Sequence, residues 1–279
     1  MSDKSHYPTS QLLSNSLSHD DIRQFSAVAG CLEGKVILVT GAGAGIGRVA
    51  ALTYARYGAT VLLLGRTSSK LEAVYDEIEQ AGYKQPAILP MDLEKASYDE
   101  MQKLAHLIDS EFGQLDGMLN NASILGQLTP LEMYDVDIFN KVMQINFTAT
   151  FRLTQALLPL LKQAQQGSIL FTTSTVGTHP RAFWGAYALS KQAVEGMSDI
   201  FTQETQNTTA LRFNCVNPGG TRTNMRAHAY PGESPLSLKI PEDIMAGYVC
   251  LMSDASIGVR GQVVALQPKD SLRPKNCEF

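Results

Sequence analysis

Short apolar runs alternate along the chain with longer segments in which apolar residues recur every three or four positions. The residues of each short run are nearly all apolar, instead of alternating between apolar and polar. This pattern is typical of strands that are covered on both faces, as in a parallel sheet. We therefore expect strands at Lys35–Thr40, Thr60–Gly65, Ala87–Asp92, Gly117–Ala122, Ser168–Ser174, Leu211–Pro218 and Gly261–Gln267.

The segments between these runs have the length and the amphipathic spacing of helices. A regular alternation of strand and helix predicts helices on both faces of a parallel sheet, because parallel neighbours need long crossover connections. The sequence thus predicts an α/β fold with one doubly wound parallel sheet of about seven strands, and a mixed α+β fold is the alternative. Helices are expected at residues 46–57, 68–81, 97–112, 135–164, 186–206 and 241–253.

No linker interrupts this alternation, so we expect a single domain at residues 34–268. Residues 1–33 are interpreted as an N-terminal extension, either packed on the surface or flexible, with a short helix near Asp20–Ala29. Residues 269–279 are interpreted as a C-terminal tail. The first thirty residues are rich in Ser, His, Asp and Gln, and they lack the basic start and apolar stretch of a signal peptide.

Composition and charge narrow the function classes. The 279 residues are 44% hydrophobic and 18% charged, which is ordinary for a soluble protein, and the net charge is -4. Lys and Arg are not clustered, so we expect no nucleic-acid partner. No apolar run reaches the ~18 residues of a membrane span, so we expect no membrane partner. The four cysteines are far apart and form no CxxC pair or metal-ligand cluster, which favours a reducing cytoplasm and no bound metal.

A glycine-rich segment, Thr40–Gly47, lies between the first predicted strand and the first predicted helix. Glycines permit a tight turn and close backbone approach there, and the helix N-terminus offers free N–H groups to a pyrophosphate. A glycine triad alone is a weak signal. Here a strand precedes it, a helix follows it, and a second strand comes about twenty residues later, which is the context of a dinucleotide site. We therefore predict that a dinucleotide cofactor binds there.

The second predicted strand ends at Gly65-Arg66-Thr67 and has no acid to accept the ribose 2′-hydroxyl of NAD. Arg66, together with the hydroxyls of Thr67 and Ser68, has instead the chemistry to hold a 2′-phosphate. This favours NADP(H) over NAD(H), and a solvated loop cation is the alternative role for Arg66. Arg48 is as consistent with a structural role as with a phosphate contact.

Tyr187 and Lys191 are four residues apart, so they share one face of a predicted helix, and Ser174 precedes the tyrosine by thirteen residues. A free tyrosine titrates near ~10, and a nearby ammonium lowers that pKa toward the working range. The three residues provide a proton donor, a means of tuning it and a hydroxyl to orient a carbonyl. Taken singly, Ser174 is equally explained as a strand-end cap and Lys191 as a solvated helix charge.

Residues 34–268 resemble the short-chain dehydrogenase/reductase family, because these motifs occur in the same order along the chain. The family's Thr-Gly-x-x-x-Gly-x-Gly and Tyr-x-x-x-Lys motifs are present, and its Asn-Asn-Ala-Gly segment is matched except for Ser123 in place of glycine. The resemblance implies a Rossmann fold. Within the family, the chain is similar to the bacterial YciK-type oxidoreductases in the segments Thr53–Thr60, Gln155–Leu161, Trp184–Tyr187 and Asn217–Thr223.

The resemblance also implies roles for single residues. Ser174, Tyr187 and Lys191 are the expected catalytic residues, together with Asn146, which would anchor a water that links Lys191 to solvent. Asp92 would contact the adenine ring. The full set of expected cofactor-binding residues is Thr40, Gly41, Gly43, Ala44, Gly45, Ile46, Gly47, Arg66, Thr67, Asp92, Leu93, Asn121, Ala122, Tyr187, Lys191, Pro218, Gly219, Thr221 and Thr223.

These residues predict a reversible hydride transfer between nicotinamide C4 and the carbon of a carbonyl or secondary alcohol. Tyr187 would protonate the developing alkoxide, Ser174 would donate a hydrogen bond to the same oxygen, and Lys191 would lower the pKa of Tyr187 and hold the nicotinamide ribose. We expect an NADPH-dependent reductase of ketones or 3-oxoacyl compounds. The alternatives are a non-catalytic NAD(P) sensor or scaffold, and a Rossmann-type methyltransferase that binds adenosylmethionine.

The loop after Pro218 is expected, by resemblance, to close over a small-molecule substrate. Its cations Arg222 and Arg226 would favour an anionic or phosphopantetheine-bearing substrate, and a mobile loop kept soluble by its charges is the alternative. The wall of the substrate pocket is expected to consist of Leu125, His179, Phe183 and Trp184. Core packing or a subunit interface is the alternative role of these residues. The resemblance further implies a homodimer or homotetramer.

Overall fold

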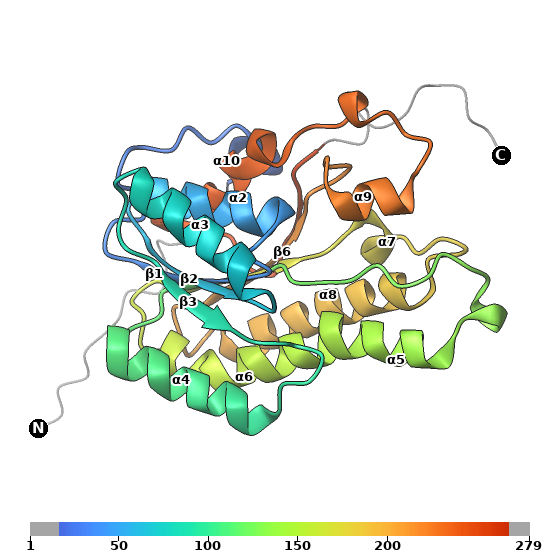
Figure 1. The fold of residues 1–279 in the computed structure, drawn as a ribbon. Helices are drawn as coiled ribbons and strands as arrows, with labels where there is room; N and C mark the ends of the chain where they lie inside the picture. The colour runs from blue at the N-terminus through green and yellow to red at the C-terminus, as the bar shows by residue number, and fades with distance from the viewer. Residues whose placement is uncertain (1–16, 268–279) are drawn as a thin grey trace, which may run out of the picture.

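Seven parallel strands form a single sheet at the centre of the molecule (Figure 1). The computed structural model describes residues 17–267. The strands follow the order β3-β2-β1-β4-β5-β6-β7, so the sheet grows outward in both directions from β1 and β4. This confirms the predicted doubly wound Rossmann fold. The strands are β1 Val36–Thr40, β2 Thr60–Gly65, β3 Ala87–Pro90, β4 Gly117–Asn120, β5 Ser168–Thr172, β6 Arg212–Asn217 and β7 Val263–Ala265.

Helices cover both faces of the sheet, and each face has its own apolar core (Figure 1). All five residues of β1 are buried, as expected for a strand between two helical layers. One face packs against α2 (Gly45–Arg56), α3 (Ser68–Gln80) and α10 (Met245–Met252). The other packs against α4 (Tyr98–Phe112), α6 (Ala149–Leu161) and α8 (Gly185–Thr205).

The long helix expected at residues 135–164 is not continuous. It consists of α5 (Val136–Met143), a π-helical turn at Gln144–Thr148, and then α6. Insertions of this kind are frequent at functional sites, and hydrophobic periodicity gives no sign of them. Two short helices, α7 (Thr175–Thr178) and α9 (Asn224–Ala229), were not expected. The segment expected to be helical at 241–253 begins with a 3₁₀ turn at Pro241–Ile244.

Residues 17–33 lie against the domain. Helix α1 (His19–Arg23) is shorter than the helix expected at Asp20–Ala29, and a capping box with Ser18 begins it. Ile22 and Leu32 are fully buried in the same core as α2 and α10. Residues 1–16 and the expected tail at 269–279 lie outside the described residues, so the domain boundaries stay predictions.

None of the helices in residues 17–267 combines the length and the apolar character that crossing a membrane requires. The same residues contain no group of three or more His, Cys, Asp or Glu side chains arranged to hold a metal ion. Three of the four cysteines lie in this part of the chain, and all three are free thiols. Additional 3₁₀ turns occur at Leu131–Met133, Pro235–Ser237 and Asp254–Ser256.

Candidate active site

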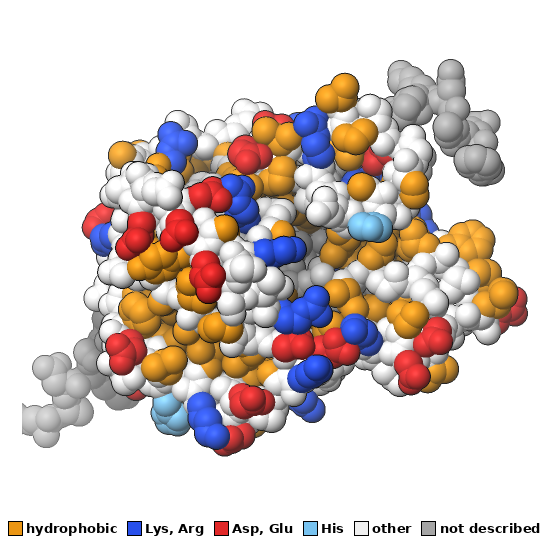
Figure 2. Space-filling view, viewed as in Figure 1, with side chains coloured by type: hydrophobic (Ala, Val, Ile, Leu, Met, Phe, Trp, Pro, Cys, Tyr) orange, Lys and Arg blue, Asp and Glu red, His pale blue; other side chains and the backbone are white. Residues whose placement is uncertain are grey.

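A large cavity opens at the carboxyl ends of the strands, where the strand order reverses between β1 and β4. Ligands bind at this place in open α/β sheets. The cavity volume is about 1660 Å³, more than a drug-sized ligand needs and sufficient for a dinucleotide together with a substrate. In Figure 2 the surface is hollowed between the two helical layers, and basic side chains lie beside the hollow.

Thr40 joins the ends of the two strands that flank this reversal. Its hydroxyl accepts hydrogen bonds from the backbone N–H groups of Asn121 and Ala122, at 2.9 and 3.0 Å. The adjoining turn allows no side chains at two positions. Gly41 has φ +69°, and a Cβ there would lie 3.1 Å from the Cα of Ala122. A Cβ on Gly47 would overlap the carbonyl of Gly41, so packing requires glycine at position 47, and the positive φ together with the tight contact favours glycine at position 41.

The start of α2 has the features of an anion site. Ala44 is its N-cap and offers no side-chain hydrogen bond, so the first N–H groups of the helix are free for a ligand. The helix has twelve residues, enough for its dipole to matter at the terminus. The predicted residues Gly41, Ala44, Gly45 and Ile46 line the cavity, whereas Thr40, Gly43 and Gly47 lie outside its lining and shape the turn.

The residues expected to hold the adenosine half lie outside the lining of the cavity. Arg66 and Thr67 are exposed at the end of β2, and none of the ion pairs within residues 17–267 includes Arg66. Asp92 is half-buried and accepts a 3.1 Å hydrogen bond from the N–H of Glu94. Leu93 is buried in the core. The structure thus leaves Arg66 available for a phosphate.

Arg48 has a structural partner. Its Nε lies 3.2 Å from one carboxylate oxygen of Glu77, and its Nη2 contacts the other. This pair connects α2 to α3, and it uses the planar fork of the guanidinium on a carboxylate. Of the two roles that the sequence left open for Arg48, the structure therefore shows the structural one.

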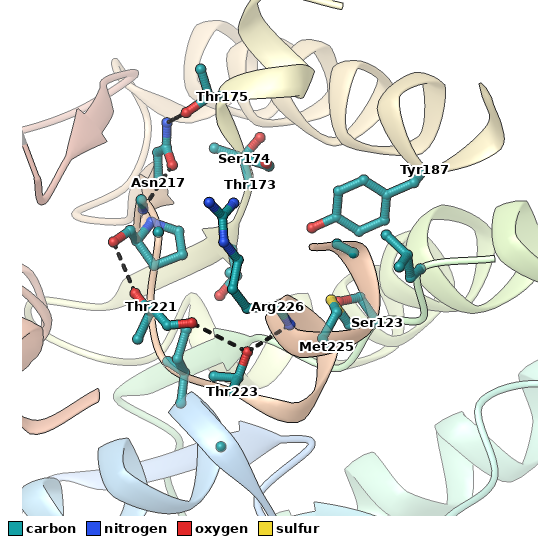
Figure 3. A pocket seen from close by; sticks show the side chains of 18 of the residues that line it. Ser123, Thr173, Ser174, Thr175, Tyr187, Asn217, Thr221, Thr223, Met225 and Arg226 are labelled. Carbon is teal, nitrogen blue, oxygen red and sulfur yellow. Dashed lines mark hydrogen bonds between the residues drawn. The ribbon is translucent and has the colours of Figure 1, made fainter. Parts of the chain in front are cut away.

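Tyr187 and Ser174 come from neighbouring elements and line the same cavity (Figure 3). Tyr187 is in the first turn of α8, and Ser174 follows β5 as the N-cap of α7. Burial raises the pKa of Tyr187 to about 12, and the Ser174 hydroxyl opposes this rise. The direction is opposite to the lowering that we expected from Lys191. At neutral pH the phenol therefore keeps its proton, which is the state of a proton donor.

Lys191 lies on the same face of α8 as Tyr187, as predicted, but outside the lining of the cavity. Its Nζ donates a 2.7 Å hydrogen bond to the carbonyl of Thr172 and lies 5.6 Å from the centroid of the Tyr187 ring. Burial lowers the pKa of Lys191 to about 8, and the negative charge of Glu195 opposes the fall. The amine therefore remains mostly protonated at neutral pH.

Glu195 was not among the predicted site residues. Its Oε1 accepts hydrogen bonds from the hydroxyls of Thr173 at 2.5 Å and Thr178 at 3.1 Å. Thr173 directly precedes Ser174, and Thr178 is the last residue of α7. The spacing of four residues from Lys191 to Glu195 places both on one face of α8, and this signal was available in the sequence.

Asn146 lies in the π-helical turn and is buried. Its Oδ1 accepts from the N–H of Ile124 at 2.8 Å, and its Nδ2 donates to the carbonyl of Ile124 at 2.9 Å and to Ser190 Oγ at 3.1 Å. Both amide hydrogens are thus used within the protein. Asn146 fixes the loop after β4 against α8, while its predicted role toward a water molecule stays a prediction.

The loop after β6 is fastened by Gln267, which the sequence did not single out, and by Asn217, the first residue of a segment that it did. Gln267 donates to the carbonyls of Pro218 at 2.8 Å and Gly220 at 3.0 Å. Asn217 donates to Thr175 Oγ1 at 3.2 Å, and its Oδ1 accepts from the N–H of Gly219 at 3.0 Å. These bonds place the loop at the edge of the cavity (Figure 3). The predicted residues Pro218, Gly219, Thr221 and Thr223 all line the cavity, as do Asn121, Ala122 and Tyr187.

Of the residues expected to contact substrate, Leu125, His179, Trp184, Arg222 and Arg226 line the cavity. Phe183 does not; it is 57% exposed, with a φ of 72° that is uncommon outside glycine. Residues that were missed include Arg181, Met225 and Glu233, which come from two segments far apart in the sequence. Tyr230, expected on the loop after Pro218, also lines the cavity.

The two loop arginines are already engaged within the protein. Arg226 forms a two-fold ion pair with Glu233, at 2.6 and 2.7 Å. Arg222 donates to the carbonyls of Pro235 at 2.7 Å and Leu238 at 3.2 Å. The sequence could not show these partners, and they weaken the expectation that the loop carries free cations for an anionic substrate.

Comparison with known proteins agrees with this geometry. The family model described as short chain dehydrogenase matches residues 35–234. The chain is 49% identical over 237 residues to the Escherichia coli (strain K12) protein called uncharacterized oxidoreductase YciK, which covers 85% of this chain and 93% of that protein. This confirms the predicted resemblance to YciK-type oxidoreductases.

Solved structures give the same result. A short chain dehydrogenase from Pseudomonas syringae superimposes with a TM-score of 0.86 at 50% identity, covering 88% of this chain and 99% of that one. A short chain dehydrogenase from Escherichia coli CFT073, in complex with NADPH, has a TM-score of 0.85 at 49% identity and covers 87% of this chain and 100% of that one. The protein is therefore an oxidoreductase that belongs to the short chain dehydrogenase family.

Proposed function

We propose that this protein is an NADP(H)-dependent reductase that transfers a hydride between nicotinamide C4 and the carbon of a ketone or a 3-oxoacyl compound. The observation that carries the proposal is the protonated Tyr187 hydroxyl in the same cavity as Ser174 and the glycine turn at the start of α2. When bound, the coenzyme supplies or accepts the hydride. The protein orients the coenzyme and the substrate, donates a proton and provides a suitable electrostatic field.

The side chains divide this task by their chemistry. Tyr187, with its raised pKa, holds a proton at neutral pH and donates it to the oxygen of the substrate carbonyl. Ser174 donates a hydrogen bond to the same oxygen and fixes its orientation. The Lys191 ammonium, 5.6 Å from the Tyr187 ring, stabilises the phenolate that forms as the proton leaves.

The cofactor turn and Arg66 support NADP(H). The free N–H groups of α2 suit a pyrophosphate, and Arg66 at the tip of β2 is exposed and outside every described ion pair. The NADPH complex of the similar Escherichia coli CFT073 structure supports the same assignment. In binding titrations, Arg66→Ala should weaken NADPH about ten- to a hundredfold, the worth of a charge-assisted hydrogen bond, and leave NADH affinity nearly unchanged.

Tyr187→Phe tests the enzymatic role directly. Losing the proton donor should lower kcat by about 10²–10⁴, while NADPH affinity stays near that of the wild type. The assay follows NADPH absorbance with a panel of ketones, aldehydes and acyl thioesters. Equal turnover in the variant would remove Tyr187 from the mechanism. If the wild type binds NADPH but turns over none of the panel, the alternative of a non-catalytic sensor gains support.

We also propose that the protein forms a homodimer or homotetramer and acts in the cytoplasm. Phe151 on α6 and Leu189 on α8 are large apolar side chains that remain 37% and 40% exposed in the single chain, which suits burial between subunits. Widely spaced free cysteines suit a reducing compartment. Light scattering at micromolar concentration tests the first proposal, because the mass of one chain would contradict it, and cell fractionation tests the second.

A further inference from the structure

Three aromatic rings stand in series along one side of the cavity. The Trp184 ring lies 5.8 Å from the Tyr187 ring and 5.8 Å from the Tyr230 ring, with interplanar angles of 50° and 44°. All three residues line the cavity. Leu125 and Met225 pack into the same apolar cluster as Trp184 and Tyr187. The proton donor therefore stands at one end of an aromatic wall, which we define as Trp184 and Tyr230.

The nearby cations reinforce this wall. Arg181 donates a 3.0 Å hydrogen bond to the Tyr230 hydroxyl, and its guanidinium carbon lies 5.5 Å from the centroid of the Trp184 ring. The guanidinium carbon of Arg226 lies 3.7 Å from the centroid of the Tyr230 ring. Contacts of this kind hold a ring by the attraction between a cation and its electron-rich face. The wall thus joins the segment before α8 to the segment after α9 in a fixed arrangement.

The same contacts make the wall a poor receptor for an anion. Glu233 neutralises Arg226 and lines the cavity itself, so this ion pair offers no net positive charge to an arriving carboxylate or phosphate. Arg181 is bound to Tyr230, and Arg222 is bound to two carbonyl oxygens. An anionic substrate would have to separate Arg226 from Glu233 before it could use that cation, and breaking a partly buried ion pair is costly.

We propose that the aromatic wall selects ketones that carry an uncharged apolar ring near the carbonyl, in preference to anionic acyl thioesters. This inference rests on the proposed function and names the substrate class of the same site. The ring packs against Trp184 and Tyr230 while the carbonyl oxygen accepts from Tyr187 and Ser174. The hydride adds to the carbonyl carbon, the Tyr187 proton goes to the oxygen, and the products are a secondary alcohol and the oxidised coenzyme.

Trp184 provides a reporter inside the proposed site, because it is the only tryptophan of the chain. The experiment forms the complex with oxidised coenzyme and then adds benzylacetone, a ketone with an unconjugated phenyl ring. Indole fluorescence should change saturably. Methyl octyl ketone has the same number of carbon atoms but no ring, and it should bind several-fold more weakly, since aromatic pairs are worth about 0.5–1.5 kcal/mol beyond buried area. Equal or tighter binding of the linear ketone would overturn the inference.

Turnover gives the second measurement. With NADPH, kcat/KM for benzylacetone should exceed that for acetoacetyl-coenzyme A by about tenfold, corresponding to the energy of one aromatic contact. A higher kcat/KM for the thioester would overturn the inference and leave the proposed function intact. If neither compound is reduced, yet benzylacetone still binds beside Trp184, the proposed reaction fails while the ring site stands. The two proposals are thereby separated.

Variants of Tyr230 isolate the wall without removing the reporter. Tyr230→Leu removes the ring and should lower kcat/KM for benzylacetone about two- to tenfold, whereas Tyr230→Phe loses only the bond to Arg181 and should lower it less. Leu236→Ala is the control, because Leu236 is 85% exposed in the same loop and does not line the cavity. Unchanged NADPH affinity verifies that each variant is folded. An equal effect of the two Tyr230 variants would contradict the role of the ring.

Discussion

The Thr173 hydroxyl donates a 2.5 Å hydrogen bond to the carboxylate of Glu195, one residue before the Ser174 hydroxyl that faces the cavity. Thr178, at the end of α7, donates to the same carboxylate oxygen at 3.1 Å. A single acid on α8 thus fastens both ends of the segment that carries Ser174. Because Tyr187 is on α8 as well, this contact fixes the two hydroxyls of the site relative to each other.

Glu195→Ala should therefore reduce kcat about ten- to a hundredfold and leave NADPH affinity nearly unchanged. Misplacing a catalytic group by about 1 Å can cost 10²-fold in rate. Glu195→Gln keeps an oxygen that accepts from both threonines, so it should recover most of the activity. It should also let the pKa of Lys191 fall further, because the negative charge of Glu195 raises that pKa.

Glu204→Gln is the matched control, since Glu204 is an exposed acid on the same helix. Steady-state kinetics with separate kcat and KM values, together with a pH profile for each variant, provide the measurements. A loss of kcat in Glu195→Gln as large as in Glu195→Ala would show that charge matters and positioning does not.

Lys191 should make the stability of the protein depend on pH. Its pKa is lowered from 10.5 to about 8 in the fold, so between these values the unfolded chain binds more protons than the native protein. The free energy of unfolding must then rise with pH from about 8, by at most ~1.4 kcal/mol per pH unit, and the penalty of the buried charge is fully present below pH 8.

Urea unfolding of the wild type and Lys191→Met at several pH values from about 7 to 10 measures this linkage. Titrating groups that lie far from Lys191 are present in both proteins and cancel in the difference. The stability of the wild type relative to Lys191→Met should increase through this range. A flat difference would mean that Lys191 titrates at its ordinary value in spite of its burial.

Gly47→Ala should damage the cofactor turn. The new Cβ would overlap the carbonyl of Gly41 and lie 2.7 Å from Nδ2 of Asn121, so the turn between β1 and α2 has to move. We expect a loss of about 1–3 kcal/mol in the free energy of unfolding and a marked fall in NADPH affinity. Thermal unfolding and a binding titration are the measurements.

Gly196→Ala should have the opposite effect on the stability of the protein, at another glycine within a helix. Nothing lies within 4 Å of a Cβ at Gly196 on α8, so alanine there should stabilise the protein by about 0.5–1 kcal/mol. If both substitutions changed stability by the same amount and sign, close packing at Gly47 would not be the cause.

Local patterns were sufficient to predict the seven strands and most of the long helices of the fold. Continuous apolar runs predicted the strands, because a strand that is buried on both faces has apolar side chains on both faces. The spacing of Tyr187 and Lys191 placed both on one face of a helix, because the helical repeat is fixed. The glycine turn could also be predicted, since its geometry depends on residues that are adjacent in the sequence. The π-helical turn around Asn146 was not, because one inserted residue leaves the apolar periodicity nearly unchanged.

The contacts that tune the site join residues far apart in the sequence, and only the folded chain decides them. Burial raises the pKa of Tyr187, and the residues next to Tyr187 in the sequence do not reveal that the side chain is buried. Glu233 neutralises Arg226, Gln267 fastens the loop after β6, and the Tyr230 ring packs against the Trp184 ring. The sequence by itself determined which chemistry is present, through short-range geometry. Tertiary packing determined which charges are paired and which rings line the cavity, because desolvation and pairing depend on three-dimensional neighbours.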